Sequence, residues 1–527
     1  MAQNKDDHPI PIIDLFAGPG GLGEGFSRLH KNGKRRFKIK LSIEKDFHAH
    51  LTLTLRAFYR QFPEGQAPED YYDYLRGNLD RKELFSRFPA EAEAAQDEAR
   101  CLTLGQDQGI SELIAEKLDG AKEWVLIGGP PCQAYSLVGR SRMLGPGARK
   151  EEEEEEDFIR RRNKKAQDFE GDHRHLLYVE YLKVIAKHRP SVFVMENVKG
   201  ILSAKLNGEL IFPKILADLA NPSKAIRGIG NVDQYRIYSL VKPYEDGQEL
   251  SPADYLIRAE DYGVPQARHR VILLGIRRDL DKGKVPVLEP SKGATVRQTI
   301  GDLPELTPGL SKGKGEALYE ALAAIKESPC WVSLQKDRGD EFVAGMLRQL
   351  EGARRREWRG ASYVPAPDRK EHPWFTDSKL DGFCNHQTRT HIKEDLWRYF
   401  FCACFAKTEP KRSPHLADFP EALLPLHKNV NEAIEGKKFG DRFRVQLADK
   451  TSTTITSHIS KDGHYFIHYD PKQYRSLTVR EAARLQTFPD NYLFEGPRTQ
   501  QFHQVGNAVP PLLAAQVAKI VASLPWR

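Results

Sequence analysis

The sequence predicts an α/β fold, a doubly wound and mostly parallel sheet, joined to a second region of different character. Three observations predict it. Over residues 1–280, short apolar runs alternate with helical stretches, the pattern of βαβ units. The first run ends in a glycine-rich turn, as the first strand of a nucleotide-binding sheet does. From residue 281 the alternation stops, and proline, glycine, arginine and aromatic residues become frequent.

The expected strands are apolar runs of strand length, separated by enough chain for helices. They are Pro11–Phe16, Lys38–Ile43, Trp124–Ile127, Val192–Met195, Arg236–Val241 and Val271–Ile276. Apolar residues three and four apart predict helices over Leu176–His188 and Pro510–Leu524. The stretch "NHQTRTHIKEDLWRYF", Asn385–Phe400, predicts another helix with basic and aromatic faces.

At 527 residues the chain is too long for one core, so we expect several domains. The changes in composition set the boundaries: a first domain over 1–280, a second over 281–470, and a return to the first over 471–527. Residues 139–172 carry "GPG", "RKEEEEEED" and "RRRNKK" with little apolar content, so they predict a long mobile loop with an acidic insertion.

Composition narrows the class of protein. A hydrophobic content of 40% is ordinary for a globular protein, and no run approaches the roughly 18 apolar residues of a membrane helix. The polar N-terminus does not resemble a secretory signal, and the six cysteines form no disulfide framework. We therefore expect a cytoplasmic protein without a membrane partner. A net charge of +7 is compatible with a polyanionic partner without proving one.

The stretch "DLFAGPGGLGEGF" follows the first expected strand. Gly18, Gly20 and Gly23 match the G-x-G-x-x-G pattern of dinucleotide-binding turns. Glu44 follows Gly23 by 44 − 23 = 21 residues, near the offset of the acid that binds a ribose in such folds. These residues predict an adenosine cofactor, and they leave open whether it serves a nicotinamide-dependent oxidoreductase or another enzyme.

Two more strands run into reactive side chains. In "VLIGGPPCQAYS", Cys132 follows two prolines at a strand's carboxyl end, where open α/β sheets bind ligands. This makes Cys132 a candidate nucleophile, and a small buried cysteine beside a tight turn is the alternative. In "VFVMENVKG", burial of Glu196 could raise its pKa and suit it to donate a proton. A strand-capping acid is the alternative for Glu196.

Further polar residues lie in "DYGVPQARHRVILLG". Gln266, Arg268 and Arg270 alternate, so they share one face of an extended segment. Two guanidinium groups there suit phosphate or carbonyl oxygens, with surface arginines as the alternative. Near the C-terminus, "REAARLQTFP" and "GNAVPP" predict an amphipathic helix and a turn that opens a helix.

Taken together and in this order, these segments resemble the DNA cytosine-C5 methyltransferase family. The matching blocks are "DLFAGPGG", "GGPPCQAYS", "ENVKG", "QARHR", "REAARLQTFP" and "GNAVPP". They span nearly the whole chain except its middle, where the family varies most. The resemblance implies a Rossmann-like, S-adenosylmethionine-dependent methyltransferase domain over 1–280, a variable target-recognition domain over 281–470, and a return to the catalytic domain over 471–527.

The resemblance also implies the chemistry. A cytosine in a specific duplex DNA sequence is flipped into the site. The Cys132 thiolate adds to C6, which makes C5 nucleophilic, and Glu196 contacts N3 and the exocyclic amine. Arg270 contacts the base O2, while Arg268 steadies a loop or a phosphate. The methyl group passes from S-adenosyl-L-methionine to C5, and loss of the C5 proton with elimination of Cys132 releases 5-methylcytosine.

For the cofactor, the resemblance places Phe16 against the adenine and Glu44 on the ribose hydroxyls. The backbone of Ala17, Gly18, Gly20 and Gly21 surrounds the methionine part, and Pro131 and Asn507 line the same pocket. The acid that reads the adenine amine in the family has no counterpart in the usual context. Asp107 in "CLTLGQDQGI" is the nearest candidate.

On the DNA side, the resemblance implies a set of contact residues around the target base. They are Gln133, Ser136, Arg140, Arg142, Asn197 and Gln266. Arg140 and Arg142 could reach phosphates, whereas phosphates would repel Glu151–Glu156, so we expect the acidic tip, 151–157, to point away from DNA. We expect a monomer in a prokaryotic cell, with the target sequence and a cognate restriction endonuclease left open.

Two rival functions remain on the same fold. One is an RNA methyltransferase, because one branch of the family modifies tRNA; its Cys-Phe-Thr element is absent and the long second domain favours duplex DNA. The other is a non-catalytic DNA-binding regulator, against which the presence of Cys132, Glu196 and Arg270 argues. A metal site is not expected, because the spacing of the middle-domain cysteines and histidines does not match a zinc finger. These residues are Cys384, His386, His391, Cys402 and Cys404.

Overall fold

An eight-stranded mixed sheet dominates the computed structural model, which describes residues 8–131, 173–206, 209–226, 234–311, 317–353, 357–408, 412–426, 430–434 and 441–526. The strand order is β10-β13-β7-β6-β1-β4-β5, and β11 pairs with β13. The strands are β1 (Ile10–Leu15), β4 (Phe37–Glu44), β5 (Ala99–Cys101), β6 (Val125–Gly128), β7 (Val192–Val198), β10 (Tyr235–Ser239), β11 (Leu256–Arg258) and β13 (His269–Arg277).

The direction of the strands decides which residues meet at one edge of the sheet. Strands β5, β4, β1, β6 and β7 are parallel, so their carboxyl ends lie together. Strand β13 runs antiparallel to β7 and pairs Arg270 with Val198. The beginning of β13 therefore lies beside the end of β7, at the edge where α/β sheets bind ligands.

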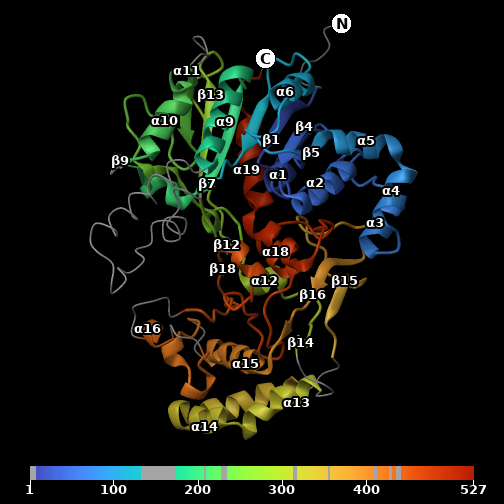
Figure 1. Ribbon diagram of the computed structural model, residues 1–527, viewed down its shortest axis with the longest axis vertical. Coiled ribbons are helices and arrows are strands. Elements are labelled where there is room, and N and C mark those ends of the chain that lie inside the picture. Colours follow the sequence, from blue (N-terminus) through green and yellow to red (C-terminus); the bar gives the residue numbers. More distant parts are fainter. Residues whose placement is uncertain are drawn as a thin grey trace, which may run out of the picture.

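Helices cover both faces of the sheet (Figure 1). Alternate strand residues face opposite sides, so Ile12 and Val194 join one apolar cluster while Ile13 and Phe193 join the other. The helices of the first cluster are α1 (Gly21–Ser27) and α19 (Pro511–Ala522). Those of the second are α6 (Ile110–Leu118), α9 (His173–His188) and α10 (Phe212–Ala220). This two-sided apolar core confirms the expected α/β fold.

Four helices lie beside the β5 edge of the sheet (Figure 1). They are α2 (Phe47–Arg60), α3 (Glu69–Arg76), α4 (Arg81–Arg87) and α5 (Pro89–Glu98). The Asp46 side chain caps α2 by accepting a hydrogen bond from the Ala49 amide at 2.8 Å. The cluster beneath these helices also takes in Leu380 and Cys384, so the middle of the chain packs against the N-terminal part.

The middle of the chain, residues 281–470, forms the lower part of Figure 1. Its longer helices are α13 (Leu318–Ala323), α14 (Pro329–Gly352) and α15 (Lys393–Thr408), and its larger strand pair is β15 (Gly360–Pro365) with β16 (Gly382–Gln387). Helix α14 bends at Gly339, where φ is +80°. Aromatic residues of α15, including Tyr399 and Phe401, fill the core of this region.

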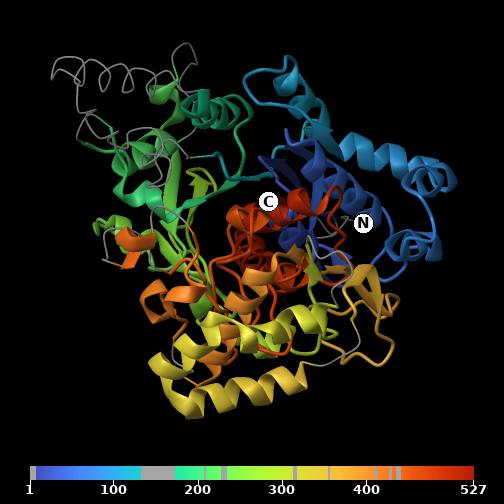
Figure 2. The same ribbon diagram turned by 60° about the horizontal axis from the view of Figure 1, so that its bottom comes forward.

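The last part of the chain joins the two halves. Figure 2 shows this red segment at the centre, between the sheet and the middle region. It contains α17 (Val479–Leu485), α18 (Arg498–Asn507) and α19. The stretch Arg498–Ala522 is apolar and long enough to be a candidate membrane span, but 72% of its most apolar window is buried inside the protein. It is therefore part of the core.

All six predicted strands are present, with bounds shifted by at most three residues. The prediction of one helix over Asn385–Phe400 was wrong. Its first part lies in β16 and in β17 (Thr390–His391), and α15 begins only at Lys393. The physical reason is pairing with distant partners, since β16 bonds to β15 and β17 to β14 (Gly309–Leu310).

Candidate active site

A cavity of about 420 Å³ opens at the carboxyl edge of the sheet. Its size falls within the range of small-molecule sites. Strand ends, the loops that follow them and the end of α18 supply its lining. The lining residues are Phe16, Gly18, Pro19, Ile43, Glu44, Lys45, Asp46, Ala49, Leu102, Thr103, Leu104, Gly129, Pro130, Pro131, Leu177, Glu196, Asn197, Val198, His503, Gln504 and Asn507.

The turn after β1 brings Phe16 and Gly18 to this cavity. Phe16 has φ of +57°, a left-handed conformation that is uncommon for a residue with a side chain. Gly18 shares that φ and has no atom within 4 Å of the position where a Cβ would stand. Unusual backbone conformations of this kind concentrate at ligand sites, because the surrounding structure must hold them in place.

Glu44, the last residue of β4, ties the turn to the next strand. Its Oε2 accepts a hydrogen bond from the Gly18 amide and its Oε1 accepts one from the Asp46 amide, both at 2.8 Å. Burial raises the pKa of the Glu44 carboxyl, although these backbone hydrogen bonds act in the opposite direction. Each oxygen retains a lone pair with which it can accept a hydrogen bond from a hydroxyl group of a ligand.

Three of the predicted cofactor residues pack closely against other parts of the chain. Ala17, Gly20 and Gly21 do not line the cavity. A Cβ on Gly21 would lie 2.2 Å from the Val509 carbonyl oxygen, and one on Gly20 would lie 2.9 Å from the Tyr492 hydroxyl. These glycines allow the start of α1 to pack closely against the C-terminal segment, which a lone match to G-x-G-x-x-G does not reveal.

The loop after β5 forms a wall that the sequence did not indicate. Leu102, Thr103 and Leu104 line the cavity, but β5 has only three residues and no apolar run to announce it. Asp107, the candidate reader of an adenine amine, lies outside the lining and accepts a hydrogen bond from the Thr103 amide at 2.6 Å. Its observed contact holds the loop in shape.

Glu196 and Arg270 form an ion pair at the same edge. The Arg270 Nε lies 2.8 Å from the Glu196 Oε1, and their side chains are 13% and 14% exposed. Burial lowers the pKa of Arg270, while the charge of Glu196 opposes that shift. Glu196 lines the cavity and Arg270 does not, so the cavity presents the carboxylate with the guanidinium bonded to it.

Asn197 holds the chain that leads to Cys132. Its Nδ2 donates a hydrogen bond to the Pro130 carbonyl at 3.1 Å. A Cβ on Gly129 would lie 2.9 Å from the Glu196 Oε2, so only glycine lets that carboxylate pack so close to the turn. These two contacts fix the turn Gly129–Pro131 against Glu196. Asn197 lines the cavity and is 5% exposed.

Five predicted site residues lie outside the described part of the chain. They are Cys132, Gln133, Ser136, Arg140 and Arg142, and the acidic run 151–157 lies there as well. Pro131, the residue before Cys132, lines the cavity.

Gln266 and Arg268 do not line the cavity. We expected a DNA contact for Gln266 and a role in steadying a loop or a phosphate for Arg268. Their side chains are 0% and 1% exposed. Arg268 donates hydrogen bonds to the carbonyls of Ile455 and Gly506, and burial together with the charge of Arg270 lowers its pKa well below the usual value. Of the two arginines, only Arg270 forms an ion pair with a carboxylate, that of Glu196, whereas Arg268 bonds to backbone carbonyls.

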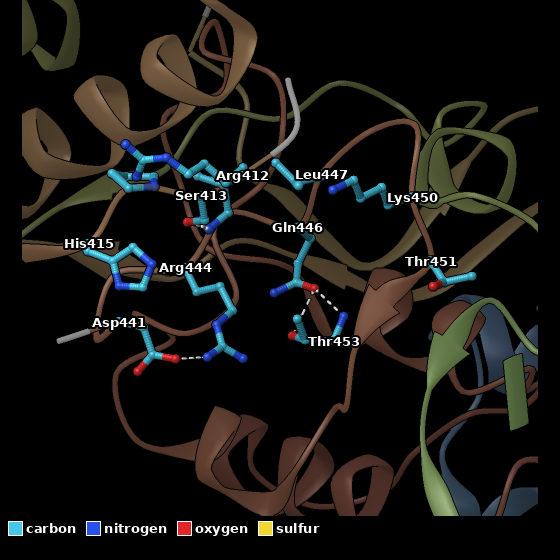
Figure 3. A pocket seen from close by; sticks show the side chains of 12 residues that line it. Arg412, Ser413, His415, Asp441, Arg444, Gln446, Leu447, Lys450, Thr451 and Thr453 are labelled. Carbon is cyan, nitrogen blue, oxygen red and sulfur yellow. Dashed lines mark hydrogen bonds and ion pairs between the residues drawn. The ribbon is translucent and has the colours of Figure 1, made fainter. Parts of the chain in front are cut away.

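A second hollow, of about 250 Å³, lies in the middle region (Figure 3). Arg412, Arg444 and Lys450 line it together with polar residues of 413–453. Arg444 forms an ion pair with Asp441. The residues that the structure describes contain no group of three or more His, Cys, Asp or Glu side chains that could hold a metal ion. Cys402 and Cys404 are buried thiols on α15.

Comparisons with known proteins agree with this geometry. The sequence model of the family described as C-5 cytosine-specific DNA methylase matches residues 107–223 and 251–523. The type II methyltransferase M.Bpa9945I of Bacillus paralicheniformis is 33% identical over 536 residues, covering 97% of this chain and 98% of that protein. The DNA (cytosine-5-)-methyltransferase M.ApeKI of Aeropyrum pernix is 26% identical over 456 residues, covering 79% and 84%.

Among solved structures, the Entamoeba histolytica methyltransferase EhMeth aligns over 98% of both chains at 14% identity, with a TM-score of 0.38. At that score the fold is better judged from the order of the strands. The family model covers most of the chain, and one relative shares a third of its residues along almost the whole length. The chain therefore belongs to the C-5 cytosine-specific DNA methylase family.

Proposed function

We propose that this DNA cytosine-5 methyltransferase takes its methyl group from S-adenosyl-L-methionine and acts on a cytosine that has been flipped out of duplex DNA. One observation carries the proposal. A single cavity is lined both by Phe16, Gly18 and Glu44, which suit an adenosine cofactor, and by Glu196 beside the turn that precedes Cys132. Methyl donor and acceptor base can therefore meet in one site.

The residues present fit the cofactor. Glu44 offers two carboxylate oxygens with free lone pairs for ribose hydroxyls, and Phe16 offers an aromatic face for adenine. Asn507 lines the cavity from the end of α18. When bound, the cofactor supplies an electrophilic methyl group on a sulfonium. The remaining chemistry belongs to the protein and the base.

The base must be made nucleophilic at C5. The Cys132 thiolate attacks C6, forming a C–S bond while the ring electrons move toward N3 and then to C5. Glu196 lines the cavity and lies 2.8 Å from Arg270, and we assign them to the N3–amine side and the O2 of the ring, where they would stabilise the charge that develops. After transfer, a base removes the C5 proton and the thiolate leaves, restoring the aromatic ring.

DNA would lie across both hollows. Strand β18 (Ser452–Thr453) pairs with β12 (Gln266–Ala267), and Thr453 aligns with Ala267, three residues before Arg270. At about 3.3 Å per residue of extended chain, Ala267 lies at most roughly 10 Å from Arg270, and Thr453, which lines the second hollow, lies on the strand beside Ala267. The cationic residues of the second hollow, Arg444 and Lys450, suit phosphates that flank the target base (Figure 3).

The cellular setting belongs to the same proposal. The protein would act as a monomer in the cytoplasm of a prokaryote and associate with the nucleoid when bound to DNA. The relatives named as type II methyltransferases support a role in restriction and modification, with a cognate endonuclease in the host.

Trapping the covalent intermediate tests this function. Duplex DNA containing 5-fluorocytosine cannot complete the reaction, because the C5 fluorine does not leave as a cation. Incubation with the cofactor should yield a protein–DNA adduct that survives denaturing electrophoresis, and Cys132→Ala should abolish it. Bisulfite sequencing of DNA from an expressing host should show protected cytosines at one sequence. Unmodified cytosine throughout, or methylation of tRNA alone, would refute the proposal.

A further inference from the structure

Three buried polar side chains form a cluster behind the cavity, between the sheet and the C-terminal segment. Gln266 and Gln486 are 0% exposed and Arg268 is 1% exposed. None of the three lines the cavity, so none can touch a bound cofactor or base. Polar side chains that are buried this deeply need hydrogen-bond partners, and a fully bonded network of them holds the backbone segments that it contacts in one conformation.

The segment that they fix is the end of α18. The Gln486 Nε2 donates hydrogen bonds to the Val505 carbonyl at 2.7 Å and to the Ala508 carbonyl at 3.3 Å. The Arg268 Nη2 donates to the Gly506 carbonyl at 3.2 Å. The last carbonyls of a helix lack partners within the helix, and here these two side chains supply them. The bonds from Gln486 bracket Asn507, the residue of this segment that lines the cavity.

The other end of the cluster is anchored to the strand pair β12–β18 and the residues that follow it. The Gln266 Nε2 donates to the Gln486 Oε1 at 3.0 Å and to the Leu485 carbonyl at 3.1 Å, while its Oε1 accepts from the Ile455 amide at 2.7 Å. Gln486 is therefore held in a single orientation, because its acceptor oxygen is fixed by Gln266 and its donor nitrogen faces the carbonyls.

The packing leaves α18 little room to move. A Cβ on Gly506 would lie 2.4 Å from the Ser457 amide nitrogen, so the helix end already touches the backbone that returns from the middle region. The position of Asn507 thus depends on the hydrogen bonds on one side and on this contact on the other.

From this arrangement we infer that Gln486 is a positioning residue for cofactor binding, which it serves by holding Asn507 at the cavity. The inference rests on the proposed use of S-adenosyl-L-methionine. Gln486→Met keeps the length of the side chain and removes both hydrogen bonds to the carbonyls. The helix end then gains freedom that binding must remove again, so the affinity for the cofactor falls while the chemistry of the base is untouched.

Calorimetry with S-adenosyl-L-homocysteine, the demethylated cofactor, tests the inference without turnover. Gln486→Met should raise the Kd about tenfold, which corresponds to about 1.4 kcal/mol. In the methylation assay, KM for the cofactor should rise by a similar factor with kcat changed less than about twofold. Gln486→Glu, which retains the acceptor for Gln266 and loses the donor, should weaken binding at least as much.

Tyr235→Phe is the matched control. Tyr235 is 1% exposed, and its hydroxyl likewise donates to a backbone carbonyl, that of Pro190 at 2.9 Å. This contact lies beside the start of β7, at the edge of the sheet opposite the cavity, so the control should lose thermal stability and keep its Kd for S-adenosyl-L-homocysteine within about twofold. A general loosening of the fold would raise the Kd in both variants, which would overturn the inference.

A double-mutant cycle with Asn507→Ala tests the route. If Gln486 acts through Asn507, adding Gln486→Met to Asn507→Ala should cause no further loss of affinity, whereas a full additional tenfold loss would contradict that route. A Kd for Gln486→Met within twofold of the wild-type value would also overturn the inference and leave the proposed function intact. Failure of the wild-type protein to bind the ligand would overturn the proposed cofactor itself.

Discussion

Two glutamate–arginine pairs in different regions of this protein use the same chemistry for different ends. At the sheet edge, Glu196 and Arg270 are 14% and 13% exposed, and Glu196 lines the cavity. In the C-terminal segment, Glu481 and Arg475 are 1% and 0% exposed and border none of the cavities described. The first pair can exchange its partner for a ligand, and the second cannot.

The hydrogen bonds around the two pairs explain this difference. The Glu481 carboxylate accepts two hydrogen bonds from Arg475, at 2.6 and 2.8 Å, and one from the Thr478 amide at 2.7 Å, which closes a capping box at the start of α17. Burial alone would raise the pKa of Glu481, but the Arg475 guanidinium holds it well below the usual range. A fully satisfied pair supports the fold, whereas a pair with spare hydrogen-bonding capacity at a cavity is available for chemistry.

The largest expected effect is on stability. Glu481→Gln leaves the Arg475 guanidinium buried without a countercharge, and breaking a buried pair in this way costs about 3–5 kcal/mol. At roughly 2–4 °C per kcal/mol, the melting temperature should fall by at least about 6 °C. Differential scanning calorimetry measures the shift. If Glu481→Gln melted within about 1 °C of the wild type, this pair would not be the structural one.

The same substitution at the other pair should act on catalysis. Glu196→Gln keeps the shape of the side chain and removes the charge that we propose faces the base, so kcat should fall by about 10²–10³, the usual loss when one electrostatic contact to a transition state is removed. The melting temperature should fall less than in Glu481→Gln, because Glu196 faces solvent through the cavity whereas Glu481 is 1% exposed. Single-turnover methylation and a thermal melt on one preparation check both halves. A large drop in melting temperature with unchanged kcat would reverse the comparison.

The sheet could be predicted because its signal is local. Four of the six expected strands are runs of mostly apolar neighbours, as in 124–127 and 271–276, and burial on both faces requires such runs. Strand β5 was missed because its three residues include the exposed Cys101. The helix expected over Asn385–Phe400 was wrong because β16 and β17 form only through partners that the local sequence does not name.

In the candidate site, too, the residues of a local motif could be predicted, and those whose surroundings depend on distant parts of the chain could not. Phe16, Gly18 and Glu44 belong to one strand–turn–strand unit, so a short motif indicates them, and they do line the cavity. The burial of Gln266 and Arg268 depends on Ile455, Gln486 and Gly506, all more than 180 residues away. Alternation places two side chains on one face of a segment, but it does not say whether that face meets a ligand or the rest of the protein.

The smallest effect concerns acid, and it should separate the two regions again. Neutral histidines are buried around the Glu481–Arg475 pair. Burial lowers the pKa of His386 to about 4 and that of His468 to about 4. The His386 Nε2 faces the Pro304 carbonyl, which can only accept, so the ring donates there and its Nδ1 accepts from the Thr478 hydroxyl. A second proton would place a buried charge near Arg475 and Arg480.

The unfolded chain takes up protons below about pH 6.5, while the folded state resists them until about pH 4. The contribution of each histidine to stability is therefore complete above pH 6.5 and is lost as the pH falls toward 4, by roughly 1–2 kcal/mol per histidine at pH 5.

Hydrogen exchange at pH 7 and pH 5, corrected for the intrinsic exchange rate, should show protection falling first in peptides that cover 383–391 and 464–481. Peptides of β6, whose residues Val125–Gly128 are all buried and carry no titratable side chain, should keep theirs. His386→Gln retains a hydrogen-bond donor and an acceptor without a titrating ring, so it should reduce the loss of protection at pH 5. Equal loss of protection in both regions would contradict the prediction, because the sheet would then be as acid-sensitive as the C-terminal segment.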